Sequence, residues 1–450
     1  MRLSLTSRPR EVPASVGIVH LGIGAFHRAH QAVYTEDAGD GWGICGITQR
    51  SAAVAERLAP QDGLYSVLER GPGGVSARVI GAVREVLTGD ATAERITDPA
   101  VRVVSLTVTE KGYRHDPATR RLRGDDPEIL RDLAGRPPET VIGRLVGGLA
   151  GREAPVTVLC CDNLTANGAF VRALLEEYCD RGGIRLPCEV SFPNAMVDRI
   201  TPATTPEDLD EAERLLGVRD EAVVVTEPFS QWVIEDTFAA GRPAWDAAGA
   251  ILTGDVAPYE TMKLRLLNGA HSMLAYLGSD FTYVSDAIAG GLGEPLRHYM
   301  DEDATPTLDV PSGFDLAAYK DSLLERFANP ALRHRIAQIA MDGSQKLPQR
   351  LLGVVRDRLA AGAEPRWAAL AVAAWMRQVQ TARELDDPMA DVLRSAVAGA
   401  DGPEKVVDAL LSITDVFGSD LRDSEVFRDL LTDHLGRLMS GTGPGGDCVF

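Results

Sequence analysis

Short apolar runs rich in β-branched residues alternate with amphipathic helical patterns over the first part of the chain. These runs are expected to form strands, and they cover residues 16–21, 43–48, 101–109, 156–161, 188–192 and 222–226. Each run is apolar almost without interruption, which is typical of strands that are covered on both faces. Because strands that alternate with helices indicate βα units, we predict an α/β domain with a mainly parallel sheet over residues 1–255.

Beyond residue 255 the strand pattern fades and amphipathic helical patterns follow one another. They cover residues 259–277, 315–327, 330–341, 347–361, 365–379, 387–398, 403–412 and 424–439. Pro and Gly separate most of these segments, so we predict an all-α domain over residues 256–450. The first helix stands at the junction of the two predicted domains, and clefts between domains are common places for small-molecule sites.

This first helix is expected to carry Lys263, Asn268 and His271 beside a buried apolar stripe. At about 100° per residue, Asn268 lies roughly 140° from Lys263 around the helix, and His271 lies roughly 80° from it. A straight helix also separates Lys263 from His271 by about 12 Å along its axis. The two can share a small substrate only if the lysine leans toward the histidine or the helix is irregular at Lys263. Taken alone, a surface lysine and a core histidine explain the pattern more simply.

The first predicted strand leads into Gly22-Ile23-Gly24, the first two glycines of a dinucleotide-binding turn. In such a turn the first glycine permits the tight bend, and the second lets the backbone approach a pyrophosphate. His27 replaces the third glycine, and a plain turn from strand to helix explains the same residues equally well. The second strand ends without the acid that usually holds the adenosine ribose. Since Arg50 could instead face a 2′-phosphate, the choice between NAD and NADP stays open.

Composition narrows the class of partner. A net charge of −19 over 450 residues argues against nucleic acid and anionic membranes as the main partner, but not against a small anionic substrate. Residues 1–15 lack the apolar core of a secretory signal, and the longest apolar run, 367–376, is too short to span a bilayer. The six cysteines show no zinc-ligand spacing, so neither structural zinc nor a disulfide framework is expected. We expect a cytoplasmic protein that acts on a small molecule.

Several runs, taken in order, resemble the mannitol dehydrogenase family of polyol-specific long-chain dehydrogenases and reductases. The most specific is 191–202, which is similar to the family signature built around Val197-Asp198-Arg199-Ile200. The other runs are 22–30, 109–113, 161–168, 227–236, 259–271 and 342–346. The helical residues beyond 350 match the family in character but carry no sharp motif.

The resemblance implies a Rossmann-type N-terminal domain, a helical C-terminal domain and an active site between them. It implies hydride transfer without a metal ion, between a nicotinamide nucleotide and a CH–OH group of a sugar alcohol or aldonate. In this family the residue that matches Lys263 is the general base, and Asn163 and Asn268 match the two asparagines that hold the reacting oxygen. Asn163 could alternatively cap the helix that follows it. A lysine with an ordinary pKa of about 10.4 is charged at neutral pH, so a base at this position needs a dry site that lowers its pKa.

The remaining site residues are implied by the same resemblance. His271 matches a histidine that orients the substrate, Asp198 and Lys346 match substrate contacts, and Glu260 matches a carboxylate near the proton path. Gln338 stands where some mannitol enzymes have a substrate-binding arginine. The resemblance therefore does not decide which arrangement of substrate hydroxyl groups the pocket recognises. The expected cofactor contacts are Gly22, Ile23, Gly24, Ala25, Phe26, Thr109, Glu110 and Lys111.

Two substrate assignments compete. Residues 338–350 and 231–236 look most like the fructuronate reductase branch, in which Lys346 and Arg350 could meet the carboxylate of D-mannonate or D-fructuronate. The alternative is D-mannitol 2-dehydrogenase, which converts D-mannitol and D-fructose; a sugar-phosphate dehydrogenase and a non-catalytic nucleotide-binding protein are less favoured. Arg350 could also be only a solvated charge at a helix start. The family tendency implies a monomer or a weak homo-oligomer.

Overall fold

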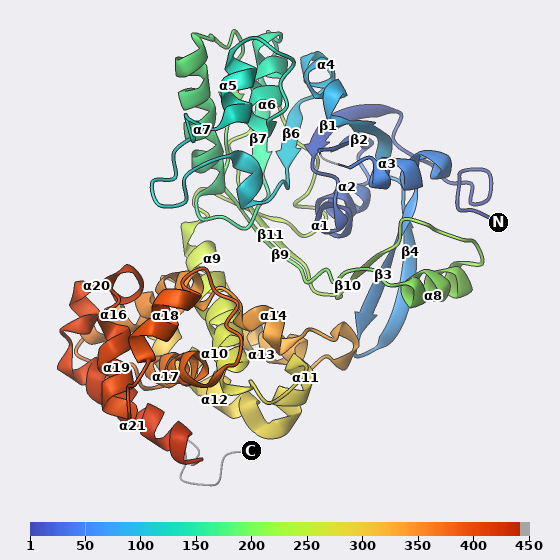
Figure 1. Cartoon of the computed structure of the whole chain (residues 1–450). Helices are drawn as coiled ribbons and strands as arrows, with labels where there is room; N and C mark the ends of the chain where they lie inside the picture. Colours follow the sequence, from blue (N-terminus) through green and yellow to red (C-terminus); the bar gives the residue numbers. More distant parts are fainter. Residues whose placement is uncertain (50, 442–450) are drawn as a thin grey trace. The chain divides into compact units, whose positions relative to one another are not determined.

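The computed structural model describes residues 1–49 and 51–441. The chain folds into two compact units, Met1–Ala257 and a second unit that starts at Pro258 (Figure 1). In the first unit a six-stranded sheet has the order β5 (Val83–Thr88), β2 (Trp42–Thr48), β1 (Ser15–Leu21), β6 (Val103–Leu106), β7 (Val156–Cys160) and β8 (Val190–Ser191). Neighbouring strands pair in parallel throughout this sheet. The strand order reverses between β1 and β6, and such a switch point is where open α/β sheets bind ligands.

Apolar residues cover the main sheet on both faces. Successive residues of a strand point to opposite faces, and in β6 Val103 belongs to one buried cluster whereas Val104 and Leu106 belong to the other. The helices of this unit are α1 (Ala25–Ala29), α2 (Gln31–Ala38), α3 (Ala53–Leu58), α4 (Thr92–Thr97), α5 (Pro127–Leu133), α6 (Val141–Ala150), α7 (Asn167–Gly182) and α8 (Pro206–Leu216). The predicted α/β fold with a mainly parallel sheet is thus confirmed.

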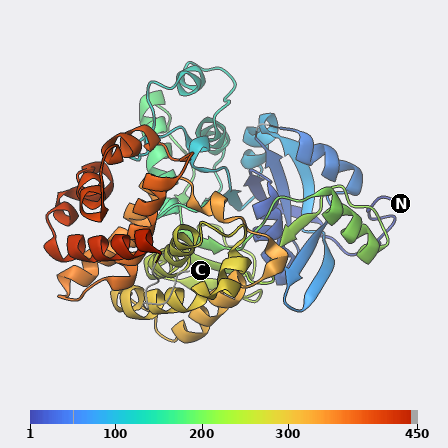
Figure 2. The same ribbon diagram turned by 60° about the horizontal axis from the view of Figure 1, so that its bottom comes forward.

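Two small sheets complete the first unit. One has the order β10 (Val224–Thr226), β3 (Tyr65–Gly71) and β4 (Gly74–Ile80), and the other has the order β12 (Ile251–Thr253), β11 (Gln231–Glu235) and β9 (Ala195–Asp198). The β3–β4 hairpin lies beside α8 in both ribbon views (Figures 1 and 2). The predicted strand at residues 222–226 is therefore present, but it belongs to a small sheet and not to the main one.

The second unit is helical from Pro258 to Gly441, apart from an isolated bridge between Tyr283 and Arg335. Its α-helices are α9 (Ala257–Met262), α10 (Gly269–Leu277), α11 (Val284–Ala287), α12 (Gly293–His298), α13 (Leu316–Phe327), α14 (Ile336–Ala340), α15 (Gly343–Leu347), α16 (Gly353–Ala360), α17 (Arg366–Thr381), α18 (Ala390–Val397), α19 (Pro403–Leu411), α20 (Thr414–Arg422) and α21 (Glu425–Ser440). Helix α17 is the core of this unit, since it packs against both α10 and α21 and buries a run of alanine, leucine and valine. The predicted all-helical character is confirmed.

Turns of π-helix interrupt several helices of this unit. They are η4 (Lys263–Asn268), η5 (Ile288–Leu292), η6 (Tyr299–Ala304) and η9 (Pro348–Leu352). Such turns are rare and often mark functional sites. Two of them, η4 and η9, carry residues of the candidate site.

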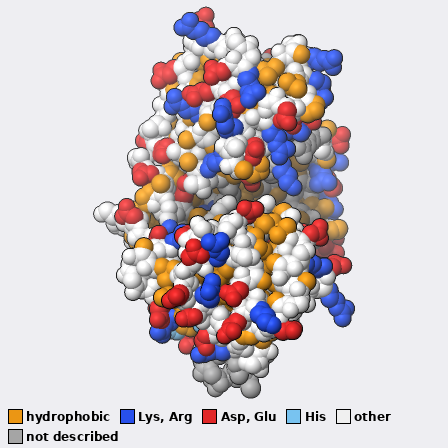
Figure 3. Space-filling model, turned by 60° about the vertical axis from the view of Figure 1, so that its left-hand side comes forward, with side chains coloured by type: hydrophobic (Ala, Val, Ile, Leu, Met, Phe, Trp, Pro, Cys, Tyr) orange, Lys and Arg blue, Asp and Glu red, His pale blue; other side chains and the backbone are white. Residues whose placement is uncertain are grey.

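The described surface shows no large region of one charge on the face in Figure 3, where acidic and basic side chains are interspersed. Across the part of the chain that the structure describes, none of the helices combines the length and the apolar character needed to cross a membrane.

Candidate active site

A tight turn connects β1 to α1 at the switch point of the main sheet. Gly22 has a positive φ of 95°, and a Cβ at this position would lie 2.2 Å from the carbonyl oxygen of Thr107. Glycine is required here, because both the backbone conformation and the close approach of the chain after β6 exclude a side chain. A Cβ at Gly24 would instead find its nearest neighbour, the Gly22 carbonyl oxygen, at 3.8 Å. The space beside Gly24 is therefore open, as it must be where backbone N–H groups approach a pyrophosphate.

A cavity of about 510 Å³ opens on this turn, within the usual range for a small-molecule pocket. Its lining includes Gly22, Ile23, Gly24, Thr48, Gln49, Thr107, Val108, Thr109, Thr140 and Arg144. Four predicted cofactor contacts, Gly22, Ile23, Gly24 and Thr109, thus face the cavity. The other four lie outside its lining: they are Ala25 and Phe26 at the start of α1, and Glu110 and Lys111 in the turn η3 (Glu110–Tyr113).

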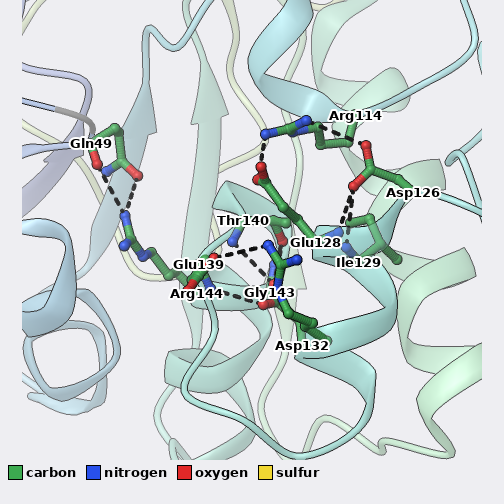
Figure 4. A network of polar contacts seen from close by, with 11 residues as sticks. Gln49, Arg114, Asp126, Glu128, Ile129, Asp132, Glu139, Thr140, Gly143 and Arg144 are labelled. Carbon is green, nitrogen blue, oxygen red and sulfur yellow. Dashed lines mark hydrogen bonds and ion pairs between the residues drawn. The ribbon is translucent and has the colours of Figure 1, made fainter.

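The end of β2 forms one rim of the cavity, where an adenosine ribose is normally held. Gln49 follows this strand, and Arg144 from α6 donates a hydrogen bond of 3.1 Å to the Gln49 side-chain oxygen (Figure 4). The side-chain nitrogen of Gln49 is buried and has no hydrogen-bond partner among the described residues. Arg50 lies outside the residues that the structure describes. The rim therefore carries an amide and a guanidinium at the place of the usual acid.

A carboxylate orders the loop that leads into α6 at this rim. Asp132 accepts hydrogen bonds from the backbone N–H groups of Glu139 at 2.9 Å and Thr140 at 3.1 Å, and from the Thr140 hydroxyl at 2.6 Å (Figure 4). The Thr140 hydroxyl oxygen in turn caps α6 by accepting the N–H of Gly143 at 3.0 Å. These contacts fix the start of α6 and hence the position from which Arg144 reaches the cavity.

Asn163 lies in the loop between β7 and α7. It does not cap that helix, because the N-cap position of α7 is occupied by Ala166. The loop is tied down at its end by Asn167, whose side chain donates to the carbonyl oxygen of Ala195 at 2.7 Å and accepts the Ala195 N–H at 2.9 Å. Asn163 is therefore presented by a short segment that is anchored to β9.

The Val-Asp-Arg-Ile signature falls at the end of β9, where its two charged residues have different surroundings. The guanidinium of Arg199 is buried, donates to the carbonyl oxygen of Ala29 at 2.6 Å and to that of Glu227 at 2.9 Å, and pairs with Glu69 at 2.6 Å. Arg199 thus joins the end of β9 to the last residue of α1 and to the chain after β10. Asp198 is paired in register with the start of β11 and is also buried.

In the second unit, Lys263 and Asn268 mark the two ends of the π-helical turn η4. The sequence predicts a helix here and leaves open an irregularity at Lys263; the helix is present, and it is irregular from Lys263 onward. A π-helical turn closes hydrogen bonds between residues five apart, as the 269 N–H does to the Leu264 carbonyl. It therefore brings Asn268, five residues after Lys263, nearer to the lysine face than the roughly 140° separation of an α-helix. The helix therefore contains the irregularity that Lys263 needs in order to approach Asn268.

His271 lies one turn further, on α10, in an aromatic setting. Its ring stacks on Phe327 with centroids 4.9 Å apart and meets His334 edge-on at 4.9 Å. Burial lowers the pKa of His271 well below its ordinary value, and the nearby His334 and Arg350 lower it further. The ring is therefore uncharged at neutral pH. Its Nε2 is buried with no hydrogen-bond partner in the described part of the chain, so it is available to a ligand.

The cations Arg326, Lys346 and Arg350 lie within electrostatic reach of His271, and the last two are predicted substrate contacts. The Lys346 ammonium donates to the carbonyl oxygens of Ile339 at 3.2 Å and Met341 at 2.5 Å, and the Arg350 guanidinium donates to the Ser272 hydroxyl at 3.1 Å. Burial lowers the pKa of both groups, and the charge of Arg350 lowers that of Lys346 further. Among the described residues neither cation forms an ion pair with a carboxylate. The nearby carboxylates Asp342, Asp386 and Asp387 raise the pKa of Lys346, whereas no carboxylate of the described residues shifts that of Arg350, so the guanidinium is the group that favours an anion.

Two further predicted residues have less distinctive positions. Glu260 lies on α9, one turn before Lys263, and Gln338 lies exposed on α14. Within the described ranges no group of three or more His, Cys, Asp or Glu side chains could hold a metal ion.

Some residues of these sites could not be singled out from the sequence. Arg144 is one arginine in a helical pattern, and only the fold brings it to Gln49. Asp162 is easier to find, because a carboxylate directly after a buried strand lies at the ligand-binding edge of a parallel sheet. The π-helical turns carry no signal in the hydrophobic pattern.

Comparisons with known proteins match the whole described architecture. A family model described as the mannitol dehydrogenase Rossmann domain matches residues 16–247, and one described as the mannitol dehydrogenase C-terminal domain matches residues 255–439. The uncharacterized oxidoreductase YeiQ of Escherichia coli (strain K12) is 44% identical over 440 residues, 91% of this chain and 89% of that protein. The D-mannonate oxidoreductase of the same organism is 41% identical over 445 residues, 92% of this chain and 91% of that protein.

A solved structure supports the same relationship. The mannitol 2-dehydrogenase of Pseudomonas fluorescens, in a ternary complex with NAD and D-mannitol, has a TM-score of 0.80 and 36% identity to this chain. The similarity covers 98% of this chain and 97% of that one. These matches confirm the resemblance that the motifs indicate. The chain belongs to the mannitol dehydrogenase family of oxidoreductases.

Proposed function

We propose that the protein is a nicotinamide-dependent reductase of sugar acids that interconverts D-fructuronate and D-mannonate. The observation that carries the proposal is the pair of partly buried cations Lys346 and Arg350 near His271, with no carboxylate partner in the described ranges. Burying a charge without a counter-ion is costly, so Arg350 above all favours an anionic ligand, since Asp342, Asp386 and Asp387 lie near Lys346 and partly offset its charge. A carboxylate is the group that distinguishes a sugar acid from a sugar alcohol, and the planar guanidinium of Arg350 suits it.

The proposed reaction uses a lysine as its proton carrier. When bound, the nicotinamide accepts the hydride that leaves the alcohol carbon, or supplies it in the reverse direction. Lys263 accepts the hydroxyl proton in the oxidation and returns it to the carbonyl oxygen in the reduction. Asn268 and Asn163 donate hydrogen bonds to that oxygen, which carries partial negative charge in the transition state. Glu260 serves the proton path, and the substrate is oriented through the remaining contacts, His271 and Asp198.

We propose NAD as the cofactor, held by the Gly22–Gly24 turn and the cavity that opens on it. The NAD complex of the related mannitol 2-dehydrogenase supports this choice. The rim at Gln49 and Arg144 lacks the acid that normally repels a 2′-phosphate, so NADP is the competing cofactor.

The alternative substrate pair is D-mannitol and D-fructose. It is favoured by the extent of similarity to mannitol 2-dehydrogenases, which are 36% identical in the Pseudomonas fluorescens structure and 38% identical in Pyrenophora tritici-repentis. A neutral polyol would leave Arg350 near His271 without an anionic partner, which is why we place this substrate pair second.

The test is oxidation of NADH and NADPH by the purified protein with D-fructuronate or D-fructose, with EDTA present throughout. The proposal expects turnover with D-fructuronate and NADH. Turnover confined to D-fructose would contradict the sugar-acid assignment, and loss of turnover in EDTA would contradict a lysine as the sole proton acceptor.

A further inference from the structure

The turn that follows β6 has a backbone conformation that its sequence does not favour. Thr109 has φ 68° and ψ 154°, in a region that is essentially restricted to glycine. Threonine is β-branched, so it is among the residues least suited to a positive φ. Thr109 and its neighbour Val108 both line the nucleotide cavity. Contacts with the surrounding structure must therefore stabilise this unfavourable backbone conformation.

The carboxylate of Asp162 makes the contacts that hold the turn. One of its oxygens accepts the N–H of Thr109 at 3.0 Å, and the other accepts the N–H of Val108 at 3.2 Å. The second oxygen also accepts the Tyr113 hydroxyl at 2.6 Å. Burial raises the pKa of Tyr113 well above its ordinary value, so this hydroxyl keeps its proton and donates. Both oxygens of the carboxylate are thus engaged with residues 108–113.

Asp162 also belongs to the loop that presents Asn163. Its own carbonyl oxygen accepts the side-chain N–H of Asn167 at 3.0 Å, and the same side chain is bonded to Ala195 in β9. Ala166, between these anchors, has a positive φ of 48°. The loop is therefore fixed at both ends, at the β6 turn through the Asp162 carboxylate and at β9 through Asn167.

The strand order places the β6 turn at a defined part of the cofactor. The order is β2, β1, β6, with an adenosine rim at the end of β2 and a pyrophosphate turn at the end of β1. A dinucleotide that crosses the switch point in this direction brings its nicotinamide half to the turn after β6. The strained Val108–Thr109 turn is then next to the reacting half of the cofactor.

We propose that Asp162 is a positioning residue for the reaction: its carboxylate holds the Val108–Thr109 turn in the shape that receives the nicotinamide half of the cofactor, and fixes the place of Asn163. Asp162 touches no reacting atom in this scheme and acts through its neighbours. The proposal rests on the proposed function for its kinetic readout, but cofactor binding alone tests it as well.

The experiment is a mutant cycle at the two partners, with Asp162→Asn, Thr109→Gly and the double variant. The carboxamide of Asp162→Asn turns an N–H group toward one of the backbone N–H donors, so it cannot hold the turn. We expect this variant to weaken NADH binding by about tenfold, the usual effect of losing a hydrogen bond to a charged group, and to lower kcat by at least as much. Glycine adopts the observed backbone angles without strain, so Asp162→Asn should weaken NADH binding far less in the Thr109→Gly background than in the parent, and most of the lost binding should be restored.

Matched controls separate positioning from general stability. Asp132→Asn removes another carboxylate that accepts backbone N–H groups beside the same cavity, and Thr109→Gly should not rescue it. Tyr113→Phe removes one of the hydrogen bonds to Asp162 and is the milder variant should Asp162→Asn fail to fold; we expect it to weaken NADH binding by a few fold, with rescue by Thr109→Gly.

NADH affinity is measured by fluorescence titration without substrate, so failure of the proposed substrate assignment does not affect this readout. The proposal is overturned if Asp162→Asn, or Tyr113→Phe in its place, binds NADH within about twofold of the parent. It is also overturned if Thr109→Gly rescues neither variant, or rescues Asp132→Asn equally well.

Discussion

At the scale of single residues, Lys263 is the proposed proton carrier. A methionine of similar length removes the amine and keeps the bulk of the side chain. Because general acid–base catalysis contributes about 10²–10⁴-fold, we expect Lys263→Met to lower kcat by at least a hundredfold while NADH binding changes by less than about threefold. The measurements are steady-state NADH oxidation and fluorescence titration.

Lys320 offers the matched control for that substitution. It lies on α13 and pairs with Asp301 on the surface, outside the candidate site. Lys320→Met should therefore retain parental turnover. If Lys263→Met kept more than about a tenth of the parental kcat, another group would have to carry the proton.

Glycine is needed at positions 22 and 24 for different reasons: at Gly22 for the fold of the turn, and at Gly24 for the approach of the cofactor. Substitution should therefore affect different properties at the two positions. Gly22→Ala places a Cβ against the Thr107 carbonyl in a left-handed conformation, so it should lower the free energy of unfolding by about 3 kcal/mol. Gly24→Ala meets no protein atom closer than 3.8 Å and should leave stability unchanged within about 0.5 kcal/mol, yet weaken NADH binding. Urea unfolding and NADH titration of both variants check this, and equal stability losses would contradict the distinction.

Some residues of the candidate site can be predicted from the sequence, whereas others are identified only from the fold. Gly22 and Gly24 stand in a short motif whose chemistry is local, and both line the nucleotide cavity, whereas the role of Lys263 as a base is a prediction that rests on the family resemblance. Arg350 and Lys346 are found as candidates, but their shared lack of a carboxylate partner in the described ranges appears only in the fold. The Asp162 contacts join the ends of two strands, and no local pattern encodes such a pairing.

At the scale of elements, a buried carboxylate links η6 to the start of α17. Asp303 accepts the N–H groups of Trp367 and Ala368, each at 2.8 Å, and is 1% exposed. Burial raises its pKa from 3.8 to about 6, although these two hydrogen bonds oppose the shift. Since the folded chain binds this proton more tightly, the contribution to stability is complete below about pH 4 and is lost as pH rises through 6.

Asp303→Asn removes this titration while keeping an oxygen acceptor for α17. We therefore expect the unfolding free energy of the variant, relative to the parent, to increase between pH 4 and pH 7 by up to about 3 kcal/mol. Urea unfolding at a series of pH values gives the difference directly. A difference that stays flat over this range would show that Asp303 does not titrate with a raised pKa.

Element prediction succeeds where burial is uniform and fails where it is not. The strands that lie in the middle of the main sheet are continuous apolar runs and are all predicted. Strands β4 and β5 are missed because they are only partly buried, and β3 is missed although its first half is buried, because its second half carries Glu69 and Arg70. The turn η4 is missed because a 3.6-residue period is assumed through Lys263–Asn268, whereas five-residue hydrogen bonding changes which side chains share a face.

At the scale of the whole molecule, the acidic balance of the chain contrasts with the anionic substrate we propose. A net charge of −19 repels small anions at long range, but salt screens this repulsion beyond about 10 Å. Recognition must therefore rest on a few local cations, and Lys346 and Arg350 are placed for that role near His271. Family membership alone does not choose between acid and polyol, since the relatives include a D-mannonate oxidoreductase and mannitol 2-dehydrogenases.

The most direct measurement of this central claim is the ratio of kcat/KM for D-fructuronate to that for D-fructose, with NADH, in the parent and in Arg350→Met. We predict that the parent prefers D-fructuronate and that Arg350→Met lowers the ratio by about a hundredfold, through KM for the acid, because a charge-assisted bidentate contact is lost. Arg377→Met is the matched control. Arg377 lies on α17 and also bonds a serine hydroxyl, Ser279 at 3.4 Å, but this contact is exposed, so the ratio should equal that of the parent. A ratio that Arg350→Met leaves unchanged, or a parent that prefers D-fructose, would contradict recognition of a sugar acid through Arg350.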